Sequence, residues 1–170
     1  DPWKKYQKFD DGLAATIANI EFLYDSLGNM ANYNLKFEVG TEESIRRFEV
    51  DELEKLLSSL ESKLYPPIFE QIEYAVVQSG VGLDLGKQTN TGTFNPDRLE
   101  KMLEVCKKFG KKSKEHNGDY LSVKEYADRF DLGLDSINIA PQFGQFETSC
   151  YLDVSSNDTP EDQFTVSYTH

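Results

Sequence analysis

The sequence predicts an α/β fold and, within that class, a partial (β/α)8 barrel with four or five βα units. Stretches with helical spacing of apolar residues alternate along the chain with short stretches of strand character. Such alternation is typical of parallel strands joined by helical crossovers. Polar residues also interrupt the expected strands, whereas strands covered on both faces are continuously apolar. An open, flavodoxin-like parallel sheet is the alternative.

Each expected element has its own local signal. The expected helices cover residues 10–27, 52–64, 96–109 and 122–132, and the expected strands cover 35–39, 74–78, the stretch after Gly110, and 135–139. Capping signals support three of the helices. Asp51 with Glu54 and Ser122 with Glu125 have the spacing of capping boxes, and Asn95 precedes a proline at the first helical position.

Two connections and the C-terminal segment are expected to be irregular. The polar, glycine-rich stretch 79–95 is long for a structureless connection, and such loops are often functional. Residues 140–144 are expected to form the loop after the last strand. Residues 1–150 would then form the barrel-type domain, an incomplete one, and residues 151–170 an irregular C-terminal segment.

Composition limits the classes of partner. The net charge of −12 argues against nucleic acid, since phosphate backbones require a basic patch. No apolar run approaches the ~18 residues that a membrane span needs, and residues 1–5 show no secretory signal. Cys106 and Cys150 form no spacing motif, which favours a reducing compartment, and therefore the cytoplasm.

Ionisable residues gather where the expected strands end. His116, one of only two histidines, has a side chain that titrates near neutral pH and suits either metal ligation or acid–base catalysis. Its neighbours Glu115 and Asp119 are candidates to orient it or to act as a base, and Glu42 ends the first strand. The alternatives are a hydrogen-bonded loop histidine, solvated carboxylates and, for Asp119, an Asx turn or helix cap.

Uncharged polar residues at strand ends form a second group of candidates. Gln78, Ser79, Asn117 and Asn138 are candidates for substrate binding, because amide and hydroxyl groups hold the hydroxyls of sugars. The alternative is a network of hydrogen bonds inside the barrel.

Three further charged residues of the strands have structural explanations. Lys36 and Glu38 lie two residues apart and are expected to form an ion pair in the barrel interior. Lys114 has the residue type of a Schiff-base nucleophile, but the lysines directly before it favour a surface cluster.

Four short segments resemble, in order, the strand ends of the tagatose-bisphosphate aldolase accessory-subunit family. They are residues 37–42, 76–81, 116–120 and 138–141, and the resemblance covers roughly residues 35–145. It implies a TIM barrel related to the class II, zinc-dependent ketose-bisphosphate aldolases; some members are described as ketose-phosphate epimerases. The chain departs from the family in lacking its N-terminal barrel strands and in having Asn117 where a small hydroxyl residue is usual.

The resemblance implies metal-assisted carbonyl chemistry on a sugar or sugar phosphate, by an aldolase or an epimerase. His116 and Glu42 would be ligands of a divalent metal, with zinc the expected ion. The alternative is a non-catalytic accessory subunit that stabilises a partner aldolase. Four strands also leave open a fragment of a longer barrel, or a half-barrel that completes itself as a homo-oligomer.

Overall fold

The computed structural model describes residues 1–27 and 35–155, and over these residues the chain is an α/β protein. Four parallel strands form one sheet in the order β1-β2-β5-β6, and β3 with β4 forms a separate antiparallel hairpin. The strands are β1 (Phe37–Val39), β2 (Ile72–Val77), β3 (Leu83–Asp84), β4 (Thr89–Asn90), β5 (Lys112–Glu115) and β6 (Ser136–Ile137). The helices are η1 (Pro2–Lys4), α1 (Phe9–Leu27), α2 (Val50–Lys63), α3 (Pro66–Glu70), α4 (Pro96–Lys108), α5 (Val123–Asp131) and α6 (Pro141–Ser155).

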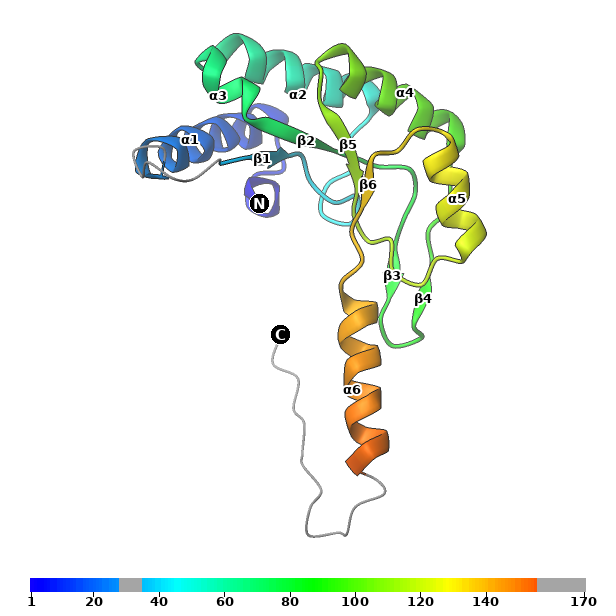
Figure 1. Ribbon diagram of the computed structural model, residues 1–170. Coiled ribbons are helices and arrows are strands. Elements are labelled where there is room, and N and C mark those ends of the chain that lie inside the picture. The colour runs from blue at the N-terminus through cyan, green and yellow to red at the C-terminus, as the bar shows by residue number, and fades with distance from the viewer. Residues whose placement is uncertain (28–34, 156–170) are drawn as a thin grey trace.

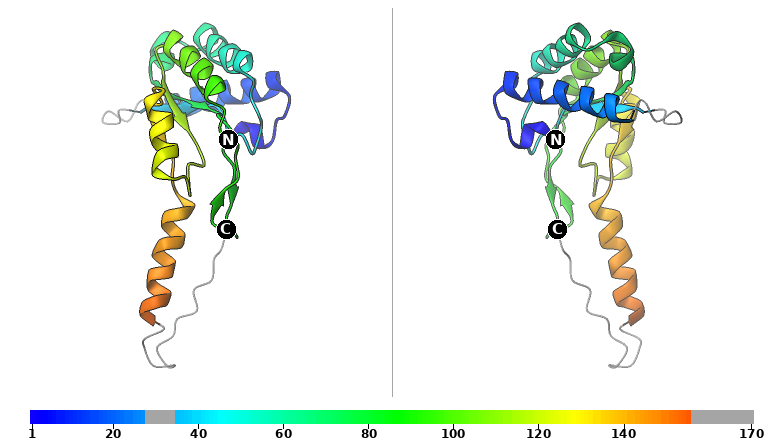
Figure 2. Two further views of the ribbon diagram at one scale, coloured as in Figure 1. Left: turned by 90° about the vertical axis from the view of Figure 1, so that its right-hand side faces the viewer. Right: turned by 90° about the vertical axis from the view of Figure 1, so that its left-hand side faces the viewer.

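The parallel sheet advances in one direction, because each strand lies beside the next parallel strand along the chain. Right-handed crossovers that advance in this way place their helices on the same face of a sheet. Figure 1 shows α2, α3 and α4 together above the sheet, with α5 beyond its β6 side. In all the views, α6 and the β3–β4 hairpin project the opposite way, away from these helices (Figures 1 and 2).

The core lies between the sheet and this helical layer. Four leucines of α2 are fully buried, and α4 contributes the buried apolar side chains of Leu99 and Met102. Ala75 and Val77 of β2 face the same core. The helical spacing of apolar residues in both segments therefore corresponds to their buried faces.

The N-terminal residues extend the same hydrophobic core. Trp3 is fully buried, and its ring centroid lies 4.9 Å from that of Phe48 in an edge-to-face contact. Gly12 makes this packing possible, because a Cβ atom there would lie 2.2 Å from the Trp3 ring. Arg46 stacks over the same aromatic group, 4.7 Å from the Phe48 centroid.

Two of the three expected helix caps are confirmed, and one is wrong. The Asn95 side chain accepts a hydrogen bond from Arg98 N, and Ser122 with Glu125 forms a capping box. At the start of α2, however, the capping box joins Glu49 and Glu52 instead of Asp51 and Glu54. The helix begins earlier because Glu49 has extended backbone and its N–H donates to Glu52 Oε2 at 3.1 Å.

Both expected loops contain regular structure. Within 79–95 the chain forms the β3–β4 hairpin, with Leu83 opposite Asn90 and Asp84 opposite Thr89. Residues 141–144 form the first turn of α6, so the prediction of a loop over 140–144 was wrong. That helix also continues past residue 150 to Ser155. The remainder of the expected irregular segment, 156–170, lies outside the described residues.

Candidate functional site

The face of the sheet opposite the helices carries a line of polar side chains. Alternation along β1 buries Phe37 and Val39 and leaves Glu38 on the other face. In the register of the sheet, Val76 of β2 pairs with Lys114 of β5, and Lys114 pairs with Ser136 of β6. Lys114 and Ser136 therefore lie side by side on this face, with the apolar Val76 next to Lys114.

His116 lies directly after β5 and is the centre of this polar group. Its Nε2 lies 2.5 Å from Glu38 Oε1, and its Nδ1 lies 3.6 Å from Glu42 Oε1. Asn138 Nδ2 lies 3.3 Å from the same Nε2. Lys114 Nζ donates to Glu38 Oε2 at 2.7 Å. We call these five residues, His116, Glu38, Glu42, Lys114 and Asn138, the His116 cluster.

Hydrogen bonds, with a smaller effect of charge, shift two pKa values within the cluster in opposite directions. The hydrogen bond with Glu38 raises the pKa of His116 above its ordinary value; the charges of Glu38 and Glu42 add to the rise, while burial opposes it. Burial acts to raise the pKa of Glu38, but hydrogen bonds from His116 and Lys114 outweigh it and hold the pKa below its ordinary value. The cluster thus favours an imidazolium beside ionised Glu38.

A pocket of about 320 Å³ opens beside the cluster. Its lining includes Glu38, Glu42 and His116 together with Val76 of β2 and the N-terminal Lys4. The three cluster side chains are 21–34% exposed, so a small molecule in the pocket would reach them. Strand ends of parallel sheets commonly hold ligands in this way.

Two of the predicted substrate-binding residues belong to this region. Asn138 is in the cluster, and Asn117 Nδ2 donates to Glu42 Oε2 at 3.3 Å. Asn117 has a positive φ of 59°, a conformation that asparagine tolerates better than most residues. It turns the loop after β5 back toward the end of β1. Both amides therefore lie beside the acid–base candidates.

Glu115 and Ser79 lie on the other face of the sheet, among the helices. Glu115 is fully buried, and its Oε2 accepts from Arg129 Nε of α5 at 2.8 Å. Its Oε1 accepts from the backbone N of Ser79 at 3.0 Å and also from the Ser79 hydroxyl. The side chain points away from its neighbour His116 because successive strand residues face opposite ways. These contacts are those of a buried ion pair that anchors the loop after β2.

Gln78 and Asp119 are also buried and bind backbone groups. Gln78 Nε2 donates to the carbonyl oxygens of Thr41 and Arg46, each at 2.9 Å, and its Oε1 accepts from Phe48 N at 2.7 Å. The amide thereby holds the connection between β1 and α2.

Asp119 Oδ1 accepts from Ala140 N at 3.0 Å and from Gln142 N at 2.8 Å. It therefore binds N–H groups at the start of α6, which an α-helix leaves without internal partners. The helix-cap alternative considered for Asp119 fits this geometry, although the capped helix is α6 and not the helix that begins at Val123.

The cluster offers few donors for a metal ion. Nδ1 of His116 and Oε1 of Glu42 are close enough to share one ion, whereas Nε2 faces Glu38. A catalytic zinc site normally takes three ligands from the protein. Among residues 1–27 and 35–155, no group of three His, Cys, Asp or Glu side chains is arranged to hold a metal ion. As placed, these residues do not complete a zinc site.

The sequence interpretation underrated two members of the cluster. The sequence predicts an ion pair of Glu38 with Lys36, and it predicts a surface position for Lys114. In the structure, Glu38 binds Lys114 and His116 instead. Lys114 is only 20% exposed and lies 5.1 Å from the Tyr74 ring centroid. The available signal was the spacing of Lys114 and His116, which lie two residues apart and so belong to one face.

The comparisons with protein-family models and with curated proteins assign no class to this chain. No family model matches the chain, and no curated protein matches it. Within the described part of the chain, no helix has the length and apolar character needed to cross a membrane.

Proposed function

We propose that this protein is an enzyme of ketose or keto-sugar metabolism, acting on free or phosphorylated sugars by aldol cleavage or epimerisation. The observation that carries the proposal is the placement of His116 between Glu38 and Glu42, beside a pocket at the ends of parallel strands. Both reactions require proton transfer next to a carbonyl group, which a histidine flanked by carboxylates is suited to perform.

We also propose that the sheet is a segment of a (β/α)8 barrel. A flavodoxin-like sheet reverses its strand order at a switch point, whereas the order β1-β2-β5-β6 contains no reversal. Barrel strands place polar residues toward the interior and catalytic residues at their carboxyl ends. The polar face with Glu38, Lys114 and Ser136, followed by His116, supports that assignment.

The residues of the cluster would divide the work as follows. His116, held as imidazolium by Glu38, donates a proton to the carbonyl oxygen as the C–C or C–H bond beside the carbonyl breaks, and takes that proton back in the reverse step. Glu42, whose carboxylate lies on the Nδ1 side of the ring, accepts the proton that the substrate releases, from a hydroxyl group in aldol cleavage or from the carbon beside the carbonyl in epimerisation. Asn117 and Asn138 direct their amides toward sugar hydroxyls.

A divalent metal such as zinc would supply Lewis-acid chemistry to a reaction of this kind. His116 and Glu42 are the residues that would hold it, but an imidazolium has no free lone pair for a metal, and no group of three His, Cys, Asp or Glu side chains in the described residues completes such a site. The proposed roles of His116 and Glu42 are therefore those of acid and base. We place the protein in the cytoplasm, consistent with the free thiols of Cys106 and Cys150.

Exchange of substrate hydrogen with solvent tests this proposal without a prior choice between cleavage and epimerisation. The protein is incubated in D2O with dihydroxyacetone phosphate, D-fructose 6-phosphate or D-fructose 1,6-bisphosphate, and deuterium beside the carbonyl is followed by NMR. We expect exchange by the wild type, loss in His116→Ala, and retention in Lys112→Ala, whose side chain is 55% exposed at the start of β5, the strand that ends before His116. No exchange with any of these sugars, or full exchange in His116→Ala, would contradict the proposal.

A second candidate is the non-catalytic accessory role. The observation that favours it is the exposed apolar side of α6, where Tyr151 and Val154 are 65% and 66% exposed. An accessory subunit would use such a surface to bind an aldolase barrel. Absence of turnover alone, with turnover restored or raised in complex with a purified catalytic subunit, would support this role over the first.

A further inference from the structure

A second pocket, which we call the hairpin–helix pocket, lies where the β3–β4 hairpin meets α6. Its volume is about 340 Å³, within the range of small-molecule sites. It is lined by Gln88, Tyr120, Gln142, Phe143, Gln145, Phe146 and Ser149. None of these residues is charged, although 28% of the chain is. The lining therefore offers no opposite charge to a phosphate, a carboxylate or an ammonium group.

Hydrogen bonds across three segments organise this pocket. The backbone N of Tyr120 donates to Gln142 Oε1 at 2.8 Å, and the Tyr120 hydroxyl bonds to Gln145 Oε1. Gln145 Nε2 in turn donates to the carbonyl oxygen of Leu85, in the turn of the hairpin, at 3.1 Å. These bonds fix two amides of the lining against the loop after β5 and the hairpin. The pocket is thus formed before any ligand arrives.

Two lining residues have unfavourable backbone conformations. Gln88 has φ of 54° and Tyr120 has φ of 61°, and they are two of the three non-glycine residues with positive φ in the described chain. Such a conformation costs on the order of 1–3 kcal/mol and is concentrated at functional sites. The third residue, Asn117, lies in the same loop as Tyr120, next to the His116 cluster. The loop after β5 thus carries one residue of this conformation beside each site, Asn117 at the His116 cluster and Tyr120 at the hairpin–helix pocket.

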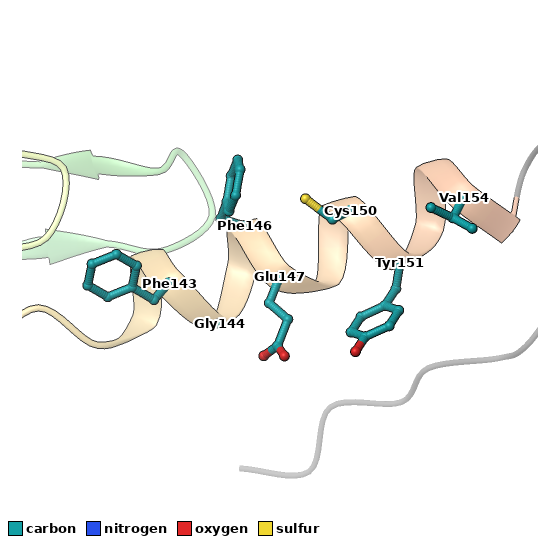
Figure 3. A pocket seen from close by; sticks show the side chains of 7 residues that line it. All are labelled: Phe143, Gly144, Phe146, Glu147, Cys150, Tyr151 and Val154. Carbon is teal, nitrogen blue, oxygen red and sulfur yellow. The ribbon is translucent and has the colours of Figure 1, made fainter.

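We propose that the hairpin–helix pocket binds a neutral carbohydrate. After these bonds, the amides of Gln142 and Gln145 each keep at least one N–H donor and one oxygen lone pair, which match sugar hydroxyls that both donate and accept. Phe143 and Phe146 add apolar ring faces for the C–H groups of a sugar ring. Figure 3 shows Phe146 projecting from α6 on the side of the hairpin, whereas Glu147 and Tyr151 project to the other side. The choice of a sugar rests in part on the proposed function.

Binding of uncharged sugars by the full chain tests this site. D-fructose and D-glucose are titrated separately, and the side-chain amide signals of Gln88, Gln142 and Gln145 are followed by NMR. We expect saturable shifts at millimolar concentrations of at least one sugar. Ser149→Phe, which fills the pocket from an exposed helix position, should abolish them. The matched control Cys150→Phe adds the same ring one residue on, outside the lining, and should leave them unchanged.

A milder variant and a site control complete the test. Phe146→Ala removes one exposed ring and should weaken binding about threefold to tenfold, as expected for loss of one aromatic contact. His116→Ala should retain sugar binding, even where it abolishes exchange of substrate hydrogen. The inference is overturned by absence of saturable shifts with both sugars, or by equal losses in Ser149→Phe and Cys150→Phe. Loss of binding in His116→Ala, with binding kept in Ser149→Phe, would overturn the inference too. That outcome would leave the proposed catalytic site intact.

Discussion

At the scale of single residues, the most deeply buried ion pair of the described chain joins Glu115 and Arg129. The two side chains are 0% and 2% exposed, so each charge depends on the other for its solvation. Removing one partner of a buried pair leaves an uncompensated charge, which typically costs 3–5 kcal/mol. Arg129→Met should therefore lower the free energy of unfolding, measured in urea, by about that amount.

A surface pair of the same helix provides the control for Arg129→Met. Lys124 pairs with Asp128, but the Lys124 side chain is 81% exposed. Lys124→Met should change the free energy of unfolding by less than about 1 kcal/mol, because exposed pairs contribute little. Similar losses in both variants would show that Glu115 does not depend on Arg129. Adding Glu115→Leu to Arg129→Met should recover part of the loss.

The pair of Glu38 and His116 should make stability depend on pH. The pKa of His116 is raised above 6.5, so its contribution is complete below pH 6.5 and is lost as pH rises through the raised value. The pKa of Glu38 is lowered below 4.5, so its contribution is complete above pH 4.5 and is lost as pH falls through the lowered value. The pair should therefore stabilise the fold most between pH 4.5 and 6.5.

Glu38→Gln tests this dependence directly. The variant should lose stability between pH 4.5 and 6.5, with a smaller difference from wild type at more alkaline pH. In an NMR titration, the His116 pKa should fall toward 6.5. The signal of His170, the other histidine, serves as the reference and is assigned with His116→Ala. An unchanged His116 titration in Glu38→Gln would refute the pairing.

Residue types alone did not separate catalytic from structural candidates. His116, Glu42, Asn117 and Asn138 were predicted and do lie together beside one pocket. Gln78 was predicted by the same logic, yet three backbone groups far away in sequence occupy its amide. Contacts of that kind join residues about 30 to 37 positions apart, and a local pattern does not contain them.

At the scale of elements, the order and type of the main helices and parallel strands could be predicted from periodicity and caps. Each buried helix has its own apolar stripe, and each parallel strand lies between two helical segments. The β3–β4 hairpin and α6 were missed. Gln88, in the turn of the hairpin, has a positive φ that a glutamine does not predict. Helix α6 begins where the carboxylate of Asp119, distant in sequence, accepts hydrogen bonds from N–H groups at its start.

Asp119→Ala should loosen the start of α6. Loss of a side-chain acceptor at a helix N-terminus typically costs about 0.5–2 kcal/mol. We expect faster amide hydrogen exchange at residues 142–146 and little change in α4. Ser122→Ala removes the cap of α5 and serves as the control, since it should speed exchange in α5 and leave α6 unchanged. Unaltered exchange at the start of α6 in Asp119→Ala would show that the cap contributes nothing.

At the scale of the whole molecule, the described chain exposes two strand edges of its parallel sheet and several apolar side chains of α6. In the described part of the chain, β1 and β6 each pair with one neighbour only. A hollow of about 550 Å³ along α6 is lined by Phe143, Phe146, Tyr151 and other residues of that helix alone. A helix of 15 residues gains most of its stability from packing an apolar face. Exposed edges and apolar stripes of this kind promote association.

We therefore expect the chain to self-associate through α6. A two-fold axis parallel to the strands would set β6 of one copy beside β1 of the other and keep all eight strands of the pair parallel, the number in a closed (β/α)8 barrel. Sedimentation should then give a mass above 19.4 kDa. Each copy carries a net charge of −12, so added salt should strengthen association by screening the repulsion.

Substitutions at the exposed positions Tyr151 and Val154 distinguish specific association through α6 from nonspecific association. Both side chains lie on α6 away from the hairpin–helix pocket, and charges there should oppose packing. Tyr151→Glu with Val154→Glu should sediment as the monomer, whereas Val123→Glu, at an 85% exposed position on α5, should behave as wild type. A wild-type chain that stays monomeric at high concentration and high salt would exclude the two-fold arrangement, because the same apolar stripe would then have to be stable in water.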